Sequence, residues 1–387
     1  MPSSIRRALN ELPITLDDTY ERMLQGIPKE KFDHASRLFQ CMVVAFRPLR
    51  VEELAEIFAI DFGASAAPNL VEGWRPENPS EAVLSTCSTL ISIVDDGNSR
   101  VVQFSHFSVK EFLISDRLQA SNLGKICQYH IPLELAHTIL ARARVTVLLQ
   151  LAEEQGEEHS RTLPLASYAT EEWVRHTKFQ DVASQIHDSL AYLFNPKSRH
   201  YVPRVLLPGA RKVCPNRPQY FTDEPNSVTP LYLAAFCDFS GLAEHLITMD
   251  ALDVNEKLGD GYAPLHGASW NGQVDTACIL LHHGADINAG GYNGYTPLHL
   301  ALGYGNIKLA QLLLERRANV NAQTKLSDTP LYLAAAGGYL EVVRLLLDHG
   351  ADATIQGRED QTPYQAASQN GHHEVAELLL EHGADGK

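Results

Sequence analysis

The chain has 387 residues, 44% of them hydrophobic and 20% charged, which is ordinary for a protein that buries two or three cores. Its formal net charge is −15, and residues 226–387 contribute most of it, with 19 Asp and Glu against 8 Lys and Arg. This acidity argues against nucleic acid or an anionic membrane as the ligand of that part. No run approaches the roughly 18 apolar residues of a membrane span, and the N-terminus lacks the apolar core of a signal peptide, so we expect a cytoplasmic protein.

The six cysteines are scattered along the chain without a Cys-x-x-Cys pair. This usage suggests neither a zinc site nor a disulfide framework. Because disulfides are rare in the cytosol, we expect reduced and mostly buried thiols.

Residues 1–30 are predicted to form a helical lead-in. Thr15 precedes Asp18 by three residues, a pairing that caps helix starts. An apolar stripe follows at helical spacing, formed by Leu16, Tyr20, Met23 and Leu24.

Residues 31–118 carry the element order of a winged-helix domain. Helices are predicted at about 32–46, at 51–60 and from about 81 onward. Two β-rich runs, 90–94 and 101–104, flank an Asp-Gly turn and predict a β-hairpin. A winged helix can place its third helix in a DNA groove, but residues 81–94 contain no Lys or Arg to meet phosphate. A DNA-binding regulator is therefore the disfavoured reading of this domain.

Residues 119–195 are predicted to form a helical domain. Apolar residues recur at helical spacing in 131–151 and in 163–194, a pattern typical of a packed core rather than a cofactor site. Six prolines then fall between residues 196 and 225, which predicts a linker.

Five near-copies of one tetrapeptide mark residues 226–387. They are Thr229-Pro230-Leu231-Tyr232, Ala263-Pro264-Leu265-His266, Thr296-Pro297-Leu298-His299, Thr329-Pro330-Leu331-Tyr332 and Thr362-Pro363-Tyr364-Gln365. Their prolines lie 34, 33, 33 and 33 residues apart. A constant period in this range indicates a repeat array.

Each copy is predicted to start a helix. A Thr hydroxyl caps an orphan backbone N–H, which contributes about 1 kcal/mol, and Pro at the first helical position forfeits only a donor that had no partner. Glycines are predicted to end the helices with positive φ. They are Gly272, Gly305, Gly338 and Gly371 after the first helix of a repeat, and Gly284, Gly350 and Gly383 after the second.

Residues 226–387 resemble ankyrin repeats, whose pattern is Gly-x-Thr-Pro-Leu-His-x-Ala-Ala, then Gly-His, then Leu-Leu-Leu, then Gly-Ala-Asp-Val-Asn. The resemblance implies a mostly α fold, an ankyrin-repeat α-solenoid preceded here by the winged-helix and helical domains. Departures from the pattern are local: Ala263 loses the cap, Arg317 replaces a helix-ending glycine, and Gln365 replaces the motif histidine. The first repeat is the most divergent, which is typical of a solenoid end.

Two phrases of the N-terminal half, residues 12–22 and 104–113, resemble the segment that follows the ATPase core in fungal NACHT-type signal-transducing proteins. That family holds nucleotide in a loop of the form Gly-x-x-x-x-Gly-Lys-Ser/Thr. Here Gly124-Lys125 is followed by Ile126, and Gln119 stands where the first glycine is required. ATP binding is therefore not implied for this chain.

No catalytic constellation, metal site or cofactor is predicted. Residues 63–67 lack the final glycine of a nucleophile elbow. Residues 372–374 read His-His-Glu, but Glu377 occupies the place of the second histidine of a zinc helix. His266 and His299 are expected to hydrogen-bond across neighbouring repeats rather than to act as an acid or base.

The ankyrin resemblance implies a partner surface on the loop tips and on the exposed edge of each first helix. In this sequence those positions hold Tyr262, Trp270, Tyr292, Asn293, Tyr295, Tyr304, Lys325, Arg358 and Glu359. Aromatic anchors are typical of protein interfaces. Packing between adjacent tips is the alternative for any single tyrosine.

We therefore expect a non-enzymatic protein whose five ankyrin repeats bind a protein partner in intracellular signalling or defence. The alternative is a regulatory fragment of a NACHT-type ATP-driven switch that lacks its own ATPase core. The last repeat keeps an apolar second helix, and no polar capping repeat follows it. We expect either fast amide exchange in residues 372–387 or a longer natural chain.

Overall fold

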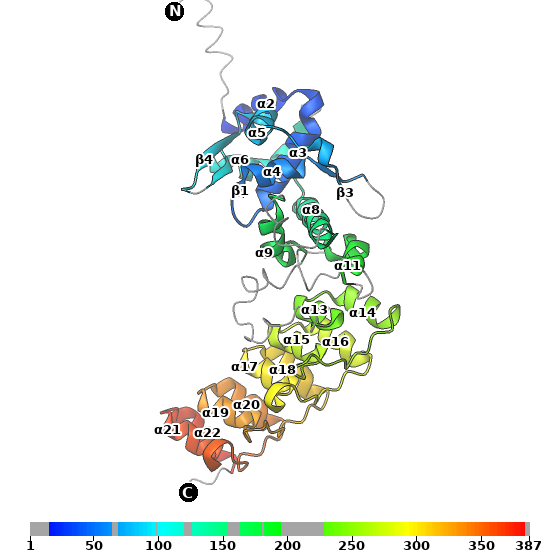
Figure 1. Cartoon of the computed structure of the whole chain (residues 1–387). Helices are drawn as coiled ribbons and strands as arrows, with labels where there is room; N and C mark the ends of the chain where they lie inside the picture. The colour runs from blue at the N-terminus through cyan, green and yellow to red at the C-terminus, as the bar shows by residue number, and fades with distance from the viewer. Residues whose placement is uncertain are drawn as a thin grey trace, which may run out of the picture. The chain divides into compact units, whose positions relative to one another are not determined.

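Figure 1 shows the computed structural model, which describes residues 15–63, 69–97, 99–119, 126–153, 163–177, 179, 182–194 and 228–383. The chain divides into two compact units, Met1–Asn216 and Arg217–Lys387. The start of the predicted lead-in and the predicted linker at 196–225 lie outside the described residues. The fold is mostly helical, as expected, with small sheets in the first unit.

The first described helix, α2 (Leu16–Gln25), begins as predicted. Thr15 Oγ1 accepts a hydrogen bond from the Asp18 backbone N–H at 3.1 Å, and Asp18 Oδ2 accepts one from the Thr15 N–H at 3.0 Å. Inside the unit, the Tyr20 ring lies 5.5 Å from that of Phe112 in α6 (Phe107–Leu113). The lead-in helix thus packs on the element that closes the winged helix.

The winged helix has three helices and a three-stranded sheet. Its elements are α3 (Phe32–Val44), β1 (Leu49–Arg50), α4 (Val51–Ile57), α5 (Pro79–Cys87), β4 (Ile91–Asp95) and β5 (Arg100–Phe104). The antiparallel sheet has the order β1-β5-β4, with Leu49 opposite Val102. The hairpin is confirmed, and its turn contains Gly97 at φ 63°. The sequence did not predict β1.

Helix α4 ends at Ile57, three residues before the predicted end. Ile60 belongs instead to a second small sheet, formed by β2 (Ile60–Asp61) and β3 (Asn69–Leu70). Short helices complete the domain: η1 (Lys29–Lys31), η2 (Glu72–Trp74) and α7 (Asp116–Gln119).

Two glutamates of α4 are buried, and each forms an ion pair with arginine. Glu53 accepts hydrogen bonds from Arg47 and Arg50 at 2.7–3.0 Å. Burial alone would raise the pKa of Glu53, but these bonds outweigh it and hold the pKa below its usual value. Glu56 bonds Arg75 at 2.9 Å and the Leu165 backbone N–H at 2.6 Å. It therefore joins the winged helix to the helical segment that follows.

That helical segment contains η3 (Ile126–Tyr129), α8 (Leu133–Glu153), α9 (Ala166–Thr177), α10 (Val182–Gln185) and α11 (His187–Phe194). The apolar run at 163–194 contains the three helices α9, α10 and α11. His137 of α8 and His176 of α9 are buried, and their Nδ1 atoms lie 2.9 Å apart. Burial lowers the pKa of His137 to about 4 and that of His176 to about 2, so both rings are neutral at neutral pH, and the Nδ1–H of one donates to the Nδ1 of the other.

The described residues of the second unit form five helix pairs. The first helices are α13 (Pro230–Cys237), α15 (Pro264–Asn271), α17 (Pro297–Gly303), α19 (Pro330–Ala336) and α21 (Pro363–Gln369). The second helices are α14 (Ser240–Thr248), α16 (Val274–His282), α18 (Ile307–Glu315), α20 (Leu340–Asp348) and α22 (His373–Glu381). Figure 1 shows the pairs stacked in sequence order. Short helices η7 (Tyr292–Gly294) and η8 (Arg358–Asp360) form two of the tips.

The predicted caps and stops of the repeats are present. Each proline is the first residue of its helix, and the Thr side chains accept from the backbone N–H three residues on. All seven helix-ending glycines have φ between 71° and 88°. Arg317 replaces such a glycine and adopts φ 66°. It therefore keeps the left-handed backbone conformation, which glycine favours and arginine does not.

Asparagines tie each loop to the next at the same period. The side-chain oxygens of Asn255, Asn288 and Asn321 accept hydrogen bonds from the backbone N–H of residues 286, 319 and 352 at 2.7–2.9 Å. Each repeat is thereby joined to its neighbour outside the helices as well as through them.

Candidate protein-binding surface

The motif histidines lock neighbouring repeats together. His266 Nδ1 accepts from the Ala263 backbone N–H at 3.0 Å, and Nε2 donates to the Tyr295 carbonyl oxygen of the next repeat at 3.0 Å. His299 Nδ1 accepts from the Thr296 backbone N–H at 3.2 Å, and its Nε2 donates to the Asp328 carbonyl oxygen of the next repeat at 3.3 Å. Burial lowers the pKa of each histidine to about 4, so both are neutral at neutral pH. Their predicted role across repeats is confirmed.

Two departures from the repeat pattern leave this arrangement intact. Ala263 has no side-chain cap, yet its N–H is still satisfied by His266. Gln365 substitutes for histidine in the fifth repeat, and its Oε1 accepts from the Thr362 N–H at 2.9 Å. The residue that precedes each first helix is therefore held by the same type of hydrogen bond in repeats two, three and five.

Tyr262 and Trp270 were expected among the partner-contacting residues, but the structure buries both. Tyr262 is 3% exposed and Trp270 is 7% exposed. The Tyr262 ring lies against the next tip, where a Cβ on Gly291 would come within 2.2 Å of it. Its edge meets the Trp270 ring at 6.5 Å. Both rings thus support the surface from beneath.

Tyr304 lies directly on this support. Its ring stacks on Trp270 with the centroids 4.3 Å apart and an interplanar angle of 30°, and 39% of the residue is exposed. A ring that is already stacked on a buried side chain loses little conformational freedom when a partner covers it. Tyr304 therefore fits the predicted role of an aromatic anchor.

The tip of the third repeat holds the next predicted residues. Tyr292 is 47% exposed at the start of η7, and Asn293 adopts φ 51° beside it. Tyr295 is half-buried, its carbonyl bonded by His266 and its ring 5.7 Å from that of His299. The Lys325 N–H donates to the Asn293 carbonyl at 2.7 Å, which joins this tip to the next.

Lys325, Arg358 and Glu359 are exposed on the two following tips, as predicted. A hydrogen bond fixes the Arg358 side chain: its Nε donates to Asp328 Oδ2 at 2.8 Å. The hydrogen bond to Asp328 raises the pKa of Arg358, opposed by a smaller desolvation effect.

The sequence analysis did not predict two further exposed residues of the array. Leu326 is 49% exposed beside Lys325, and Tyr339 is 55% exposed after Gly338. The exposure of Leu326 could have been predicted, because it is an apolar residue at a loop tip. The Tyr339 ring turns back over Gly337, where a Cβ would lie 2.5 Å from it, and no pattern in the sequence indicates that turn.

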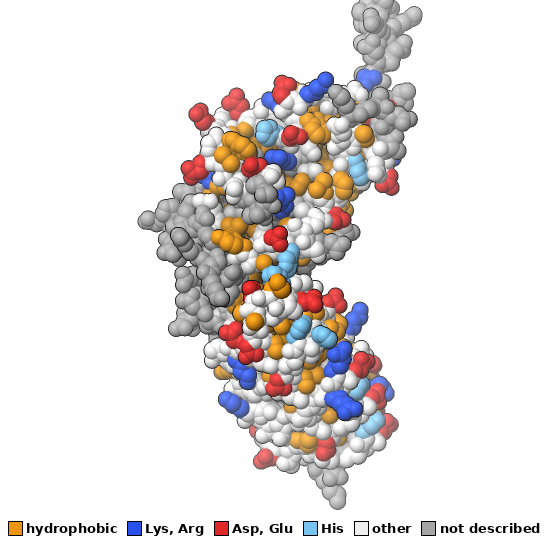
Figure 2. All heavy atoms as spheres, turned by 90° about the vertical axis from the view of Figure 1, so that its right-hand side faces the viewer, with side chains coloured by type: hydrophobic (Ala, Val, Ile, Leu, Met, Phe, Trp, Pro, Cys, Tyr) orange, Lys and Arg blue, Asp and Glu red, His pale blue; other side chains and the backbone are white. Residues whose placement is uncertain are grey.

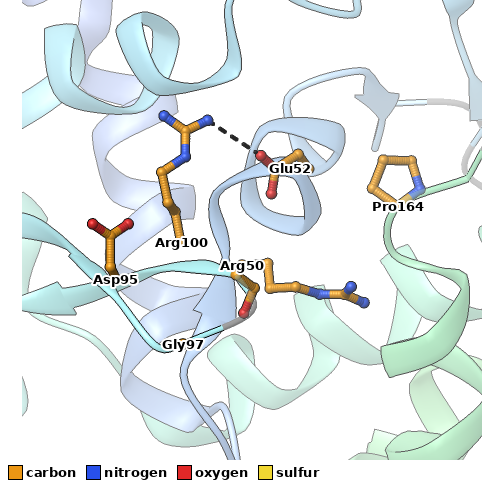
Figure 3. Close-up of a pocket in the computed structure, with 7 residues that line it drawn as sticks. Arg50, Glu52, Asp95, Gly97, Arg100 and Pro164 are labelled. Carbon is orange, nitrogen blue, oxygen red and sulfur yellow. Dashed lines mark hydrogen bonds and ion pairs between the residues drawn. The ribbon is translucent and has the colours of Figure 1, made fainter.

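In the winged-helix unit, the helix that such a domain can place in a DNA groove has no cation. Helix α5 contains no Lys or Arg. Figure 3 shows an open pocket lined by Arg50, Glu52, Asp95, Gly97, Ser99, Arg100 and Pro164. Its cations already face carboxylates: Arg50 bonds Glu53 at 2.8 Å, and Arg100 lies 3.5 Å from Glu52.

The charged side chains of the repeats do not form a patch of one sign on the face drawn in Figure 2. In Figure 2, acidic, basic and histidine side chains are interspersed over the array.

Among the described residues, no cluster of three His, Cys, Asp or Glu could hold a metal ion. The described helices are all too short or too polar to cross a membrane. The Gly124-Lys125 pair and most of residues 63–67 lie outside the described residues.

Comparison with protein families agrees with this geometry. Residues 204–291 and 318–387 match a model for ankyrin repeats in three copies, and residues 280–331 match one for ankyrin repeats in many copies. Residues 20–123 match the winged helix domain of GPI inositol-deacylase, a type found in fungal NACHT proteins. The chain therefore carries C-terminal ankyrin repeats and an N-terminal winged-helix domain of that type.

Two relatives show how far the likeness extends. The chain is 27% identical over 295 residues to "Azaphilone pigments biosynthesis cluster protein L" of Monascus ruber, covering 72% of this chain and 61% of that protein. It is 34% identical over 62 residues to Alpha-latrocrustotoxin-Lt1a of Latrodectus tredecimguttatus, covering 16% of this chain and 4% of the toxin. The chain thus spans less than two thirds of either relative.

Proposed function

We propose that the chain is a non-enzymatic binding protein whose ankyrin array holds a protein partner at the tips and first-helix ends of repeats two to five. The observation that carries this proposal is Tyr304, which is 39% exposed and stacked on the buried Trp270. Tyr292 and Leu326 add exposed apolar area on neighbouring tips. Rigid aromatic anchors are what protein interfaces use for affinity.

The mechanism is surface complementarity on a rigid support. The neutral histidines, the asparagine ties and the capped helices fix the tips before a partner arrives. Little ordering free energy is then required at binding. A cytoplasmic role in signalling or defence is consistent with the winged-helix match, whose type occurs in fungal NACHT proteins.

Affinity capture with the full chain tests this function. Wild type is compared with a Tyr292→Ala, Tyr304→Ala variant, and Tyr192→Ala serves as the control because Tyr192 is an equally exposed tyrosine of the other unit. We expect at least one protein to be retained by wild type and by the control and lost from the double variant. Identical sets from all three would refute partner binding through this surface.

The winged-helix match also supports a second candidate. The chain would then act as a regulatory segment for a separate ATPase of the NACHT type. Pull-down of such an ATPase with ATP, with ADP and without nucleotide discriminates between the two functions. Nucleotide-dependent binding through the winged helix would favour this second candidate, whereas nucleotide-independent binding through the tips favours the first.

A further inference from the structure

The sequence contains three Asn-Gly dipeptides, and all of them lie in the array: Asn271-Gly272, Asn293-Gly294 and Asn370-Gly371. Asparagine is a chemically labile residue, and a following glycine favours its deamidation, because the glycine nitrogen can approach the asparagine side chain without hindrance from a Cβ. The three dipeptides share this local chemistry. A difference in their reactivity therefore comes from how the fold holds each one.

Deamidation begins when the glycine nitrogen attacks Cγ of the asparagine. The new N–Cγ bond closes a succinimide ring, the Cγ–Nδ2 bond breaks, and Nδ2 leaves as ammonia with the proton of the glycine N–H. Water then opens the ring, which gives aspartate when the new N–Cγ bond is cleaved and isoaspartate when the original peptide bond is cleaved. A hydrogen bond that holds the side-chain amide away from the glycine nitrogen slows the first step.

Two of the three side-chain amides are held in this way. Asn271 Nδ2 donates to the Phe236 carbonyl oxygen of the preceding repeat at 2.9 Å, and Asn370 Nδ2 donates to that of Ala336 at 2.9 Å. Both asparagines lie at the C-terminal end of a first helix. Their Cγ atoms can turn toward the glycine nitrogen only after this end of the helix has opened.

Asn271 is also covered by the following repeat. Asn306 Nδ2 donates to the Trp270 carbonyl oxygen at 2.9 Å, and a Cβ on Gly272 would lie 2.6 Å from Asn306 Oδ1. At Gly371, by contrast, nothing lies within 4 Å of the Cβ position. We therefore expect Asn271 to be the best protected of the three asparagines.

Asn293 is held by its backbone alone. Among the described residues, its side chain forms no hydrogen bond. Its backbone adopts φ 51° and ψ 21° in the three-residue helix η7, and the Gly294 N–H donates to the Gly291 carbonyl oxygen at 2.9 Å. The reaction therefore requires the tip to open, but both helices of the repeat can remain intact. Such local openings need less free energy than the opening of a packed helix.

Either product would change the tip of the third repeat. Residues 287–307 contain no Asp, Glu, Lys or Arg, so a carboxylate at position 293 would be the first charge in this run, next to the exposed Tyr292. Isoaspartate also routes the main chain through Cβ and Cγ, which lengthens the tip. Little room is available for this change, because a Cβ on Gly294 would already lie 3.2 Å from the Lys325 backbone nitrogen of the next tip.

We infer that Asn293 is the preferred deamidation site of the array, at which an uncharged tip acquires a carboxylate. The reaction needs water and no other reactant. Its consequence for a partner rests on the proposed binding function, whereas the chemistry at Asn293 does not.

Peptide mapping by mass spectrometry tests the site. The full chain is incubated at mildly alkaline pH, once folded and once in urea, and the replacement of NH2 by OH is followed at all three dipeptides. In urea we expect rates within about threefold of one another, because no fold protects any of them. In the folded chain Asn293 should react at least about tenfold faster than Asn271 and Asn370, because it alone reacts without the opening of a helix.

Equal rates at the three asparagines of the folded chain, or faster reaction at Asn271 or Asn370, would overturn the inference. So would an Asn293 that stays intact in the folded chain while it reacts in urea. The variant Asn293→Gln is the control, because glutamine must close a larger ring and reacts slowly. It should remove the signal at position 293 and leave the rates at the other two sites unchanged.

Failure of the proposed function is seen separately, by affinity capture with fresh and with incubated protein. Incubated wild type should retain less of a captured partner than fresh wild type, whereas incubated and fresh Asn293→Gln should retain equal amounts. If the mass data show reaction at Asn293 and neither fresh protein retains a partner, the deamidation site stands and the proposed binding function fails.

Discussion

The carboxylate of Asp328 is fully buried and bonded to the Nε of Arg358, one repeat later, at 2.8 Å, while 49% of the arginine side chain remains exposed. The other carboxylate oxygen, Oδ1, has no hydrogen-bond partner among the described residues. The arginine therefore provides the main compensation for a buried charge and at the same time joins two neighbouring tips.

Replacing Arg358 by Ala should destabilise the array by about 3 kcal/mol, at the low end for a broken buried pair because water reaches the guanidinium. Urea unfolding monitored by circular dichroism measures the change. Arg344→Ala is the matched control, since Arg344 is exposed on α20. A loss no larger than that of the control would contradict the assigned role. The double variant Asp328→Asn, Arg358→Leu should recover part of the loss, because no buried charge remains.

The buried histidines should make the array sensitive to acid. The pKa of His266 and of His299 falls to about 4 on folding, from about 6.5 in the unfolded chain. The unfolded state then binds more protons, so the stability is fully present above pH 6.5 and is lost as the pH falls toward 4. Each histidine should contribute a slope of about 1.4 kcal/mol per pH unit in that window.

Glutamine is the informative substitution, because Gln365 already replaces this histidine in the fifth repeat and accepts the same type of backbone hydrogen bond. The variant His266→Gln, His299→Gln should unfold with a shallower pH dependence than wild type between pH 6.5 and 4. Other buried histidines contribute equally to both proteins and cancel in the comparison. Parallel curves of stability against pH would contradict the assignment.

Arg317 should be a site of easy stabilisation. It holds φ 66° at the position where Gly284 and Gly350 end the equivalent helices. A non-glycine residue in this conformation costs about 1–2 kcal/mol, partly offset by the entropy that glycine loses on folding. Arg317→Gly should therefore stabilise the array by about 0.5–1 kcal/mol, and the reverse change Gly350→Arg should destabilise it. Thermal unfolding of both variants provides the check, and a destabilised Arg317→Gly would contradict it.

Glu56 should control the packing of α9 against the winged helix. Its carboxylate accepts the Leu165 N–H at 2.6 Å, just before α9 begins. Glu56→Ala should cost about 2–3 kcal/mol, since a buried backbone N–H and Arg75 lose their partner. Hydrogen exchange at residues 163–177 should accelerate. Glu52→Ala, which removes an exposed carboxylate 3.5 Å from Arg100, should leave exchange there unchanged.

The sequence predicts the repeats well because most of them carry the same helix cap, first-turn proline and helix-ending glycines, and two of them carry the histidine. Thr296, Pro297 and His299 act within one turn of helix, so their roles follow from local chemistry. The strand β1 could not be predicted in the same way. Leu49 and Arg50 follow a proline and form only two residue pairs, with a strand about fifty residues further along the chain. That pairing is a tertiary interaction.

The partner surface was only partly predictable for the same reason. The positions of Tyr292 and Tyr304 follow from the repeat period, but exposure depends on neighbouring side chains. Tyr262 is buried because the next tip has a glycine, Gly291, that lets the ring approach. Tyr339 is exposed because its ring turns away from Gly305. Both outcomes depend on rotamers, which a repeat pattern does not specify.

Site-specific photocrosslinking tests the central claim most directly. A photoreactive phenylalanine analogue replaces Tyr304 in the full chain, and in a separate protein it replaces Tyr192 of the other unit as the control. Each protein is irradiated in lysate of the source cells, and adducts are identified by mass. The account predicts a discrete protein adduct at position 304 that is absent from position 192. The same adducts at both positions, or none at 304, would contradict partner binding by the ankyrin surface.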